Sequence, residues 1–130
     1  MAQDHLIVFV CEHGAAKSVL AATYFNHIAR ERSLGIQAIA RGTTPDPNLS
    51  AITVAGLTKD GLSPSAAVPQ KLTLEDVESA GKIISFCELP DPFQKRGRTE
   101  QWDDIPPVSE NYERARDIIV EHLLQLINHL

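Results

Sequence analysis

Two near-continuous apolar stretches, at residues 6–10 and 82–87, are the strongest hydrophobic signals in this chain. Runs of this length, rich in isoleucine and valine, are typical of strands that are buried on both faces of a parallel sheet. A weaker strand is predicted at residues 36–41, just before Gly42, and a short fourth strand near residues 98–102. The pattern therefore predicts a sheet of four strands.

Helical patterns fill the intervals between the strands and the end of the chain. The start of one of them carries a Thr73–Asp76 pair, which is typical of a capping box. The last predicted helix has apolar residues three and four positions apart, namely Tyr112, Ala115, Ile119, Leu123, Leu126 and Leu130. The predicted helices span residues 15–33, 50–59, 73–80 and about 110–128. Strands that alternate with helices favour an α/β fold, a three-layer sandwich around a four-stranded parallel sheet.

Length, composition and charge narrow the possible classes of protein. A chain of 130 residues, 43% apolar and 22% charged, is expected to fold as one globular domain spanning residues 1–130. The net charge of −5, from 12 basic and 17 acidic residues, disfavours nucleic acids and anionic membranes as partners. No apolar run approaches the roughly 20 residues that cross a bilayer.

Cysteine and histidine usage bears on the compartment and on metal binding. The first ten residues lack the basic segment and cleavage site of a signal peptide, so we expect a cytoplasmic protein. The two cysteines, Cys11 and Cys87, are too few for a disulfide scaffold, and in a reducing compartment both are expected to be free thiols. The five histidines show no metal-ligand spacing, so we predict neither a metal nor a cofactor.

The segment from Cys11 to Ser18, Cys-Glu-His-Gly-Ala-Ala-Lys-Ser, follows the first predicted strand and leads into a helix. A tight loop of this kind directs backbone N–H groups at one point, where the helix dipole adds about half a positive charge. Such a loop binds an oxyanion and favours a thiolate, with Lys17 to balance charge and Ser18 to donate to sulfur. A nucleotide P-loop is excluded, because it needs glycines where Cys11 and Ala16 stand. The alternative is that Cys11 is only a small buried residue at a strand end.

This segment resembles the Cys-x-x-x-x-x-Arg-Ser phosphate loop of the low-molecular-weight protein tyrosine phosphatases and of the arsenate reductases that share their fold. The resemblance continues through residues 40–43, Ala-Arg-Gly-Thr, and residues 61–65, and it covers nearly the whole chain. Several features look more like the arsenate reductase branch: His13, the Ala15-Ala16 pair, Cys87 at the end of the third strand, and Gln101-Trp102.

The resemblance implies a phosphatase-I-like fold and a role for each part of the loop. Cys11 would attack phosphorus or arsenic in line, and an aspartate before the last helix would protonate the leaving oxygen. The partners implied are a phosphate or arsenate oxyanion and a thiol reductant such as thioredoxin. The residues implied in oxyanion binding are Glu12, His13, Gly14, Ala15, Ala16, Lys17 and Ser18.

The second cysteine has two interpretations. In the reductases a cysteine at this strand end forms a disulfide with the nucleophile after arsenic leaves, and a third cysteine relays the oxidation outward. No third cysteine exists in this chain. Cys87 is therefore either the redox partner of Cys11, opened directly by a reductant, or an inert residue.

The sequence departs from the family pattern in three places. Lys17 stands in place of the family arginine, so the planar fork that holds two oxygens is lost. Gly14 stands in place of the asparagine that braces the loop. The acid is expected to be Asp104, then Asp103, with Asp91 third. Because of the reductase-like features above, we expect arsenate reduction ahead of phosphomonoester hydrolysis. The third possibility is a domain that binds phosphate, or a phosphorylated partner, without turnover.

Overall fold

The fold is built on one parallel sheet of four strands in the order β2-β1-β3-β4. The computed structural model describes residues 5–94 and 98–130. The predicted fold class is confirmed, including the fourth strand, although β3 ends two residues before Cys87. The strands are β1 (Leu6–Cys11), β2 (Gln37–Gly42), β3 (Lys82–Ser85) and β4 (Thr99–Gln101).

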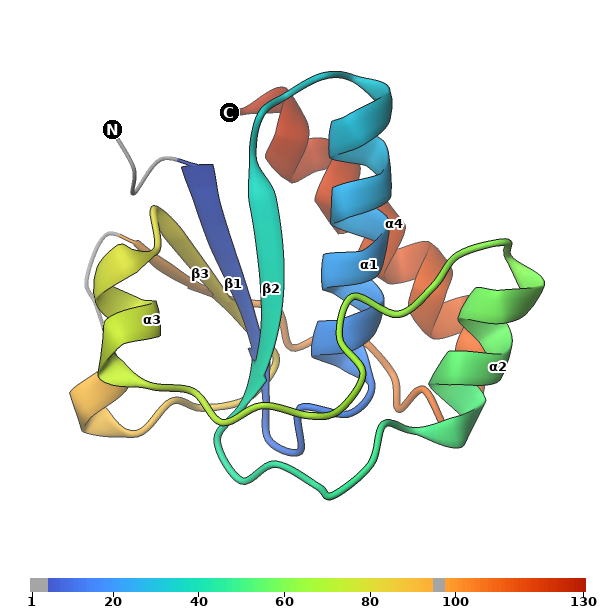
Figure 1. Ribbon diagram of the computed structural model, residues 1–130, viewed down its shortest axis with the longest axis horizontal. Helices are drawn as coiled ribbons and strands as arrows, with labels where there is room; N and C mark the ends of the chain where they lie inside the picture. The colour runs from blue at the N-terminus through green and yellow to red at the C-terminus, as the bar shows by residue number, and fades with distance from the viewer. Residues whose placement is uncertain (1–4, 95–97) are drawn as a thin grey trace.

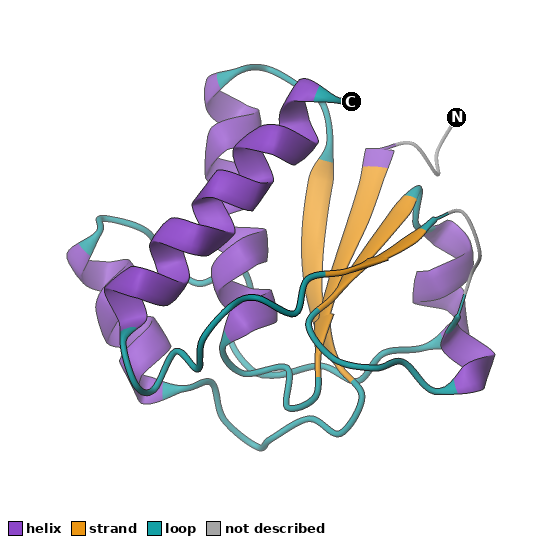
Figure 2. Cartoon of the chain, turned by 180° about the vertical axis from the view of Figure 1, so that it is seen from behind, coloured by secondary structure: helices purple, strands orange, loops and turns teal. Residues whose placement is uncertain are grey.

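Helices cover both faces of the sheet and complete the three layers (Figure 1). One face carries α1 (Lys17–Glu31) and α4 (Tyr112–Asn128), with α2 (Ala51–Lys59) packed against both helices. The other face carries α3 (Leu74–Ser79) and, beside it, a single turn of 3₁₀ helix, η2 (Asp91–Phe93). Figure 2 shows the same layers from behind. Within the described residues, no helix is long and apolar enough to span a membrane.

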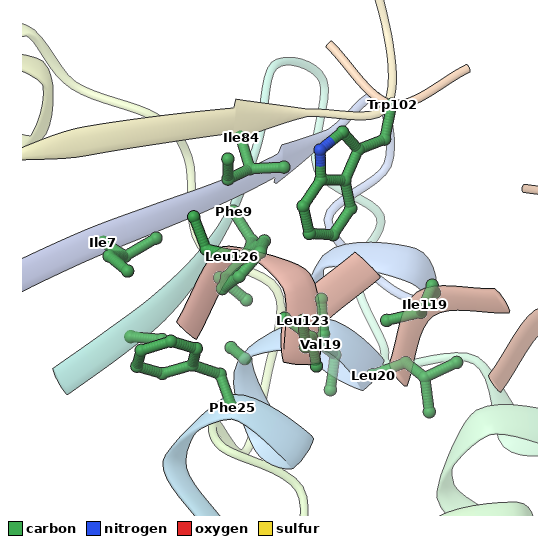
Figure 3. Close-up of a cluster of buried hydrophobic side chains, with 14 of the residues drawn as sticks. Ile7, Phe9, Val19, Leu20, Phe25, Ile84, Trp102, Ile119, Leu123 and Leu126 are labelled. Carbon is green, nitrogen blue, oxygen red and sulfur yellow. The ribbon is translucent and has the colours of Figure 1, made fainter. Parts of the chain in front are cut away.

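The larger core lies between the sheet and the α1–α4 layer (Figure 3). Phe9 and Ile84 project from the sheet toward Phe25 of α1 and Leu123 of α4, and all four side chains are fully buried. The apolar spacing of the last helix is confirmed as far as Leu126, but Leu130 lies beyond the helix end and is 57% exposed.

A smaller core lies under α3 on the opposite face of the sheet. It joins Val8, Val10 and Ile83 to Val77 of α3 and to Leu89. The predicted capping pair begins α3, since the Thr73 hydroxyl accepts from the Asp76 N–H and the Asp76 carboxylate accepts from the Thr73 N–H. Because strand side chains alternate, Cys11 has the same orientation as Phe9 and belongs to the α1–α4 face.

The β2 edge of the sheet is bound by a side chain of α1. The Asn26 amide donates to the Ala38 carbonyl at 3.0 Å and accepts from the Ala38 N–H at 2.8 Å. These two bonds tie α1 to the amino-terminal end of β2.

Candidate active site

A cavity of about 400 Å³ opens at the carboxyl ends of β1 and β3. In doubly wound α/β folds this end of the sheet is where ligands bind. Its walls come from the loop after β1, from the segment after β2 through Asp46, and from the segment before α4 through Val108. Cys11 and Cys87 both line it.

The loop between β1 and α1 is held by the segment that follows β2. The carbonyls of Cys11, Glu12 and His13 accept hydrogen bonds from the N–H groups of Thr43, Thr44 and Asp46, at 3.2, 2.7 and 2.9 Å respectively. In a trans peptide the N–H points opposite to the carbonyl. The N–H groups that follow these carbonyls are therefore turned away from the β2 segment, as an oxyanion cradle requires.

Two glycines allow this close approach. Gly14 has φ +61°, a conformation that favours glycine. A Cβ atom on Gly14 would lie 2.9 Å from the Gly42 nitrogen, and one on Gly42 would lie 2.7 Å from the Gly14 nitrogen. The glycine in place of the family asparagine is thus in van der Waals contact with a second glycine, and contact between the two backbones braces the loop.

Cys11 and Lys17 stand at the two ends of the loop. The Cys11 Sγ lies 3.1 Å from the Ser18 Oγ, and both residues are buried. Lys17 is the first residue of α1 and lines the cavity. No carboxylate in the described part of the chain lies within 4.0 Å of its ammonium. The Lys17 charge is therefore free to act on a bound anion.

Cys87 lies just past the end of β3 and is half-buried. Its N–H donates to the Ser85 Oγ at 3.1 Å, and that hydroxyl lies 3.6 Å from the Cys87 Sγ and donates to the Cys87 carbonyl. Burial raises the pKa of the Cys87 thiol above its ordinary value, and the negative charges of Cys11 and Glu12 add to the increase. Cys87 therefore lies at the same cavity as Cys11, and its thiol is the less acidic for its burial there.

The raised pKa predicts how the two thiols react with iodoacetamide. A thiol whose pKa is raised stays protonated at neutral pH and forms its thiolate only above the ordinary range. At about pH 7 Cys11 should therefore be alkylated before Cys87, and Cys87 should become reactive as the pH rises above about 9. Peptide mass spectrometry after timed quenching measures both sites. Preferential labelling of Cys87 at neutral pH would contradict the roles assigned to the two thiols.

The aspartates predicted as the acid do not line the cavity. The Asp104 carboxylate binds the His122 Nε2 at 2.8 Å, and this bond lowers the pKa of Asp104 below its usual value. A lowered pKa disfavours the protonated form that a general acid needs. Asp103 is exposed, and Asp91 begins η2. The segment before α4 contributes Pro107, Val108 and Ser109 to the cavity instead.

A different group of ionisable residues lines the cavity. The His13 Nδ1 lies 3.1 Å from an Asp46 carboxylate oxygen, and its Nε2 lies 3.5 Å from a Glu12 oxygen. All three residues line the same cavity as Cys11. Asp46 is missing from the sequence prediction, although it stands in a Pro-Asp-Pro turn just past the end of β2, where a site residue is expected.

Comparisons with known proteins show the family of folds to which this arrangement belongs. No family model matches the chain, and no curated protein sequence matches it. Solved structures do. A low-molecular-weight protein tyrosine phosphatase from T. tengcongensis is 18% identical, with a TM-score of 0.88 over 98% of this chain and 100% of that one.

Two arsenate reductases also match. The enzyme from Archaeoglobus fulgidus is 22% identical, with a TM-score of 0.76 over 94% of this chain and 98% of that one. The thioredoxin-dependent enzyme from Corynebacterium glutamicum is 19% identical, with a TM-score of 0.72 over 98% of this chain and 64% of that one. The chain therefore has the fold that the low-molecular-weight protein tyrosine phosphatases share with these arsenate reductases.

Proposed function

We propose that this protein is an enzyme that uses Cys11 as the nucleophile toward a tetrahedral oxyanion, and that its reaction is the reduction of arsenate. One observation carries the proposal: Cys11 and Cys87 line the same cavity, with Cys11 at the start of the oxyanion loop. A phosphatase of this fold needs one thiol and an acid, whereas a reductase needs two thiols. The second thiol lines the cavity, while the expected aspartates do not.

We propose that the reaction proceeds in two steps. The Cys11 thiolate attacks arsenic, a sulfur–arsenic bond forms, and one arsenate oxygen leaves as water after taking up protons. The Cys87 thiol then gives up its proton to the solvent, and its sulfur attacks the Cys11 sulfur. A disulfide forms, the sulfur–arsenic bond breaks with its electron pair on arsenic, and arsenite leaves. Two electrons have passed from the thiols to arsenic, and an external thiol must restore them.

The loop supplies the positive field for the oxyanion. The backbone N–H groups after Cys11 and the N-terminus of α1 surround the anion, and the Lys17 ammonium neutralises part of its charge. Ser18 donates to the Cys11 thiolate at the distance observed, 3.1 Å. The Glu12, His13 and Asp46 side chains line the cavity together, and we assign His13 as the proton donor to the leaving oxygen in place of Asp104.

Lys17 favours a second candidate function, which is oxyanion binding without turnover. Binding needs charge and loop amides, both of which are present, whereas the transition state needs two oxygens held in fixed geometry. Phosphomonoester hydrolysis is the other alternative, because phosphate and arsenate have nearly the same size and charge. A cytoplasmic location and an external thiol reductant accord with this proposal, since the thioredoxin-dependent enzyme above, which also draws its electrons from a thiol, has the same fold.

The test is a single turnover without external reductant. Pre-reduced protein mixed with arsenate should yield up to one arsenite per molecule, and Cys87→Ser should lower that yield at least about 100-fold, since no second electron donor remains. Any hydrolysis of an aryl phosphate should stay intact in Cys87→Ser, while Cys11→Ser should abolish both activities. Arsenite is measured by anion-exchange chromatography with mass detection.

Each other result identifies a different function. Equal loss of both activities in Cys87→Ser, together with a denaturation midpoint below that of the parent protein, would give Cys87 a structural role. Aryl phosphate hydrolysis without arsenite would make the protein a phosphatase. Phosphate binding with neither activity in the parent would make it an oxyanion-binding domain.

A further inference from the structure

Cys87 also lines a second cavity, which has a volume of about 370 Å³. Its walls include Ser85 and Leu89 of the segment after β3, Gln94 after η2, and Thr99 and Gln101 of β4. Cys87 is the residue that this cavity shares with the cavity that holds Cys11. Cys87 thus lines two cavities.

The two cavities lie on opposite faces of the sheet. Ser85 pairs in register with Val10 and Gln101, and Val10 belongs to the core under α3, so these three side chains share the α3 face. Phe86 projects the other way and stacks on Phe9 with ring centroids 6.4 Å apart, on the α1–α4 face with Cys11. Cys87 follows Phe86 at the sheet end, where both faces are accessible.

The walls of the second cavity suit a small polar molecule. Gln94 donates to the Leu89 carbonyl at 2.7 Å, which orients its amide. In the described part of the chain, the side chains of Gln101 and Glu88 make no hydrogen bond or ion pair, so an amide and a carboxylate are free for a ligand. The volume lies in the range of small-molecule sites. Cys87 is recessed and half-buried.

Thiol–disulfide exchange sets a direction for the reductant. The attacking thiolate, the attacked sulfur and the leaving sulfur must lie nearly in line. A reductant that attacks Cys87 in a Cys11–Cys87 disulfide must therefore approach from the side away from Cys11. The second cavity is on that side. Cys11 is also the better leaving group, because Ser18 can donate to its thiolate.

We propose that the cavity bounded by Ser85, Gln94, Thr99 and Gln101 binds a low-molecular-weight thiol with a peptide-like body, and that this thiol reduces the Cys11–Cys87 disulfide by attacking Cys87. The inference rests on the disulfide of the proposed function. The Gln94 and Gln101 amides face the peptide groups of the thiol, and the Glu88 carboxylate faces its ammonium group. With such a reductant, Cys11 and Cys87 complete the catalytic cycle without a third cysteine.

The exchange balances with two molecules of the thiol. The first thiolate bonds to the Cys87 sulfur, the Cys11–Cys87 bond breaks, and its electron pair leaves on Cys11. A second thiolate attacks the ligand sulfur of the mixed disulfide, and Cys87 leaves as a thiolate that takes a proton from water. The protein gains two electrons, and the two thiols become a small disulfide.

The experiment uses a disulfide made without arsenate, so that it is independent of the proposed reaction. Diamide oxidises the full-length protein to the disulfide. The bond is verified by the loss of two titratable thiols and by a mass lower by two hydrogen atoms. Reduction of the disulfide is then followed with glutathione as the peptide-like probe and with mercaptoethanol as the bare thiol. Gln101→Leu should slow glutathione about five- to tenfold, the effect of one or two lost hydrogen bonds, and leave mercaptoethanol unchanged. Gln125→Leu, the same change at an exposed site on α4, should alter neither rate.

The trapped intermediate gives a second readout, since glutathione should be found on Cys87 and not on Cys11. Four results would overturn the inference: equal slowing of both thiols in Gln101→Leu, no slowing of either, faster reduction by thioredoxin than by glutathione at equal thiol concentration, or a disulfide that diamide does not close. The proposed function fails separately if the protein forms no arsenite from arsenate with excess dithiothreitol, a reductant that does not have to bind in the second cavity.

Discussion

Lys17→Arg should raise arsenate turnover about 100-fold or more while changing phosphate affinity far less. A well-aimed donor to a transition-state oxyanion typically contributes about 3–4 kcal/mol, and the guanidinium fork can hold two oxygens as charge builds on them. The lysine ammonium supplies charge alone. The small residues Ala15 and Ala16 beside Lys17 leave room for the larger head. Steady-state rates with arsenate and with an aryl phosphate, beside phosphate dissociation constants, measure the effect.

The matched control is Lys59→Arg, the same substitution at an exposed position of α2. It should change neither turnover nor phosphate affinity. Fast turnover by the parent protein together with no gain in Lys17→Arg would show that the ammonium is sufficient, and the argument from fork geometry would be wrong. A gain in phosphate affinity as large as the gain in rate would show that the arginine acts on the ground state.

Gly42→Ala should abolish oxyanion binding although residue 42 lies outside the loop. Its new Cβ would stand 2.7 Å from the Gly14 nitrogen and 3.0 Å from the His13 carbonyl carbon, both of which are backbone atoms. The strands must separate or the loop must shift, at a cost of about 1–3 kcal/mol in the free energy of unfolding. A displacement of about 1 Å in the loop should lower turnover about 100-fold. Urea denaturation and phosphate titration measure the two effects.

Gly35→Ala separates this contact from backbone strain. Gly35 has φ +68° and nothing within 4 Å of its Cβ position, so alanine there costs about 1–2 kcal/mol through conformation alone. That variant should be less stable but should bind phosphate like the parent. Normal phosphate binding in Gly42→Ala would show that the Gly14–Gly42 contact does not shape the loop.

The local features of this protein could be predicted from its sequence. The apolar runs around Phe9 and Ile84 place two central strands, since only buried strands tolerate such runs, and the Thr73–Asp76 pair places the start of α3. The loop from Cys11 to Ser18 follows from its position between a strand and a helix. Each of these inferences depends on residues that are close in the chain.

Other features depend on contacts between distant residues and could not be predicted. Asp104 stands at the expected distance before α4, but His122, 18 residues later, binds its carboxylate away from the cavity. The contact between Gly14 and Gly42 and the ion pair between His13 and Asp46 join segments that the sequence separates by about thirty residues. The two-sided approach to Cys87 arises because β3 stops at Ser85, and apolar residues alone predict a strand that continues to Cys87.

The Asn26 amide has a consequence for how molecules of this protein meet in concentrated solution. An edge strand offers unpaired N–H and C=O groups to any extended chain, and so invites edge-to-edge growth of a larger sheet. Near the start of β2 the N–H and C=O of Ala38 are already bound by Asn26, in the pattern a neighbouring strand would use. The opposite edge, β4, is only three residues long. One edge is thus blocked by a side chain and the other is too short to nucleate assembly, which protects a sheet of hydrophobic strands against aggregation.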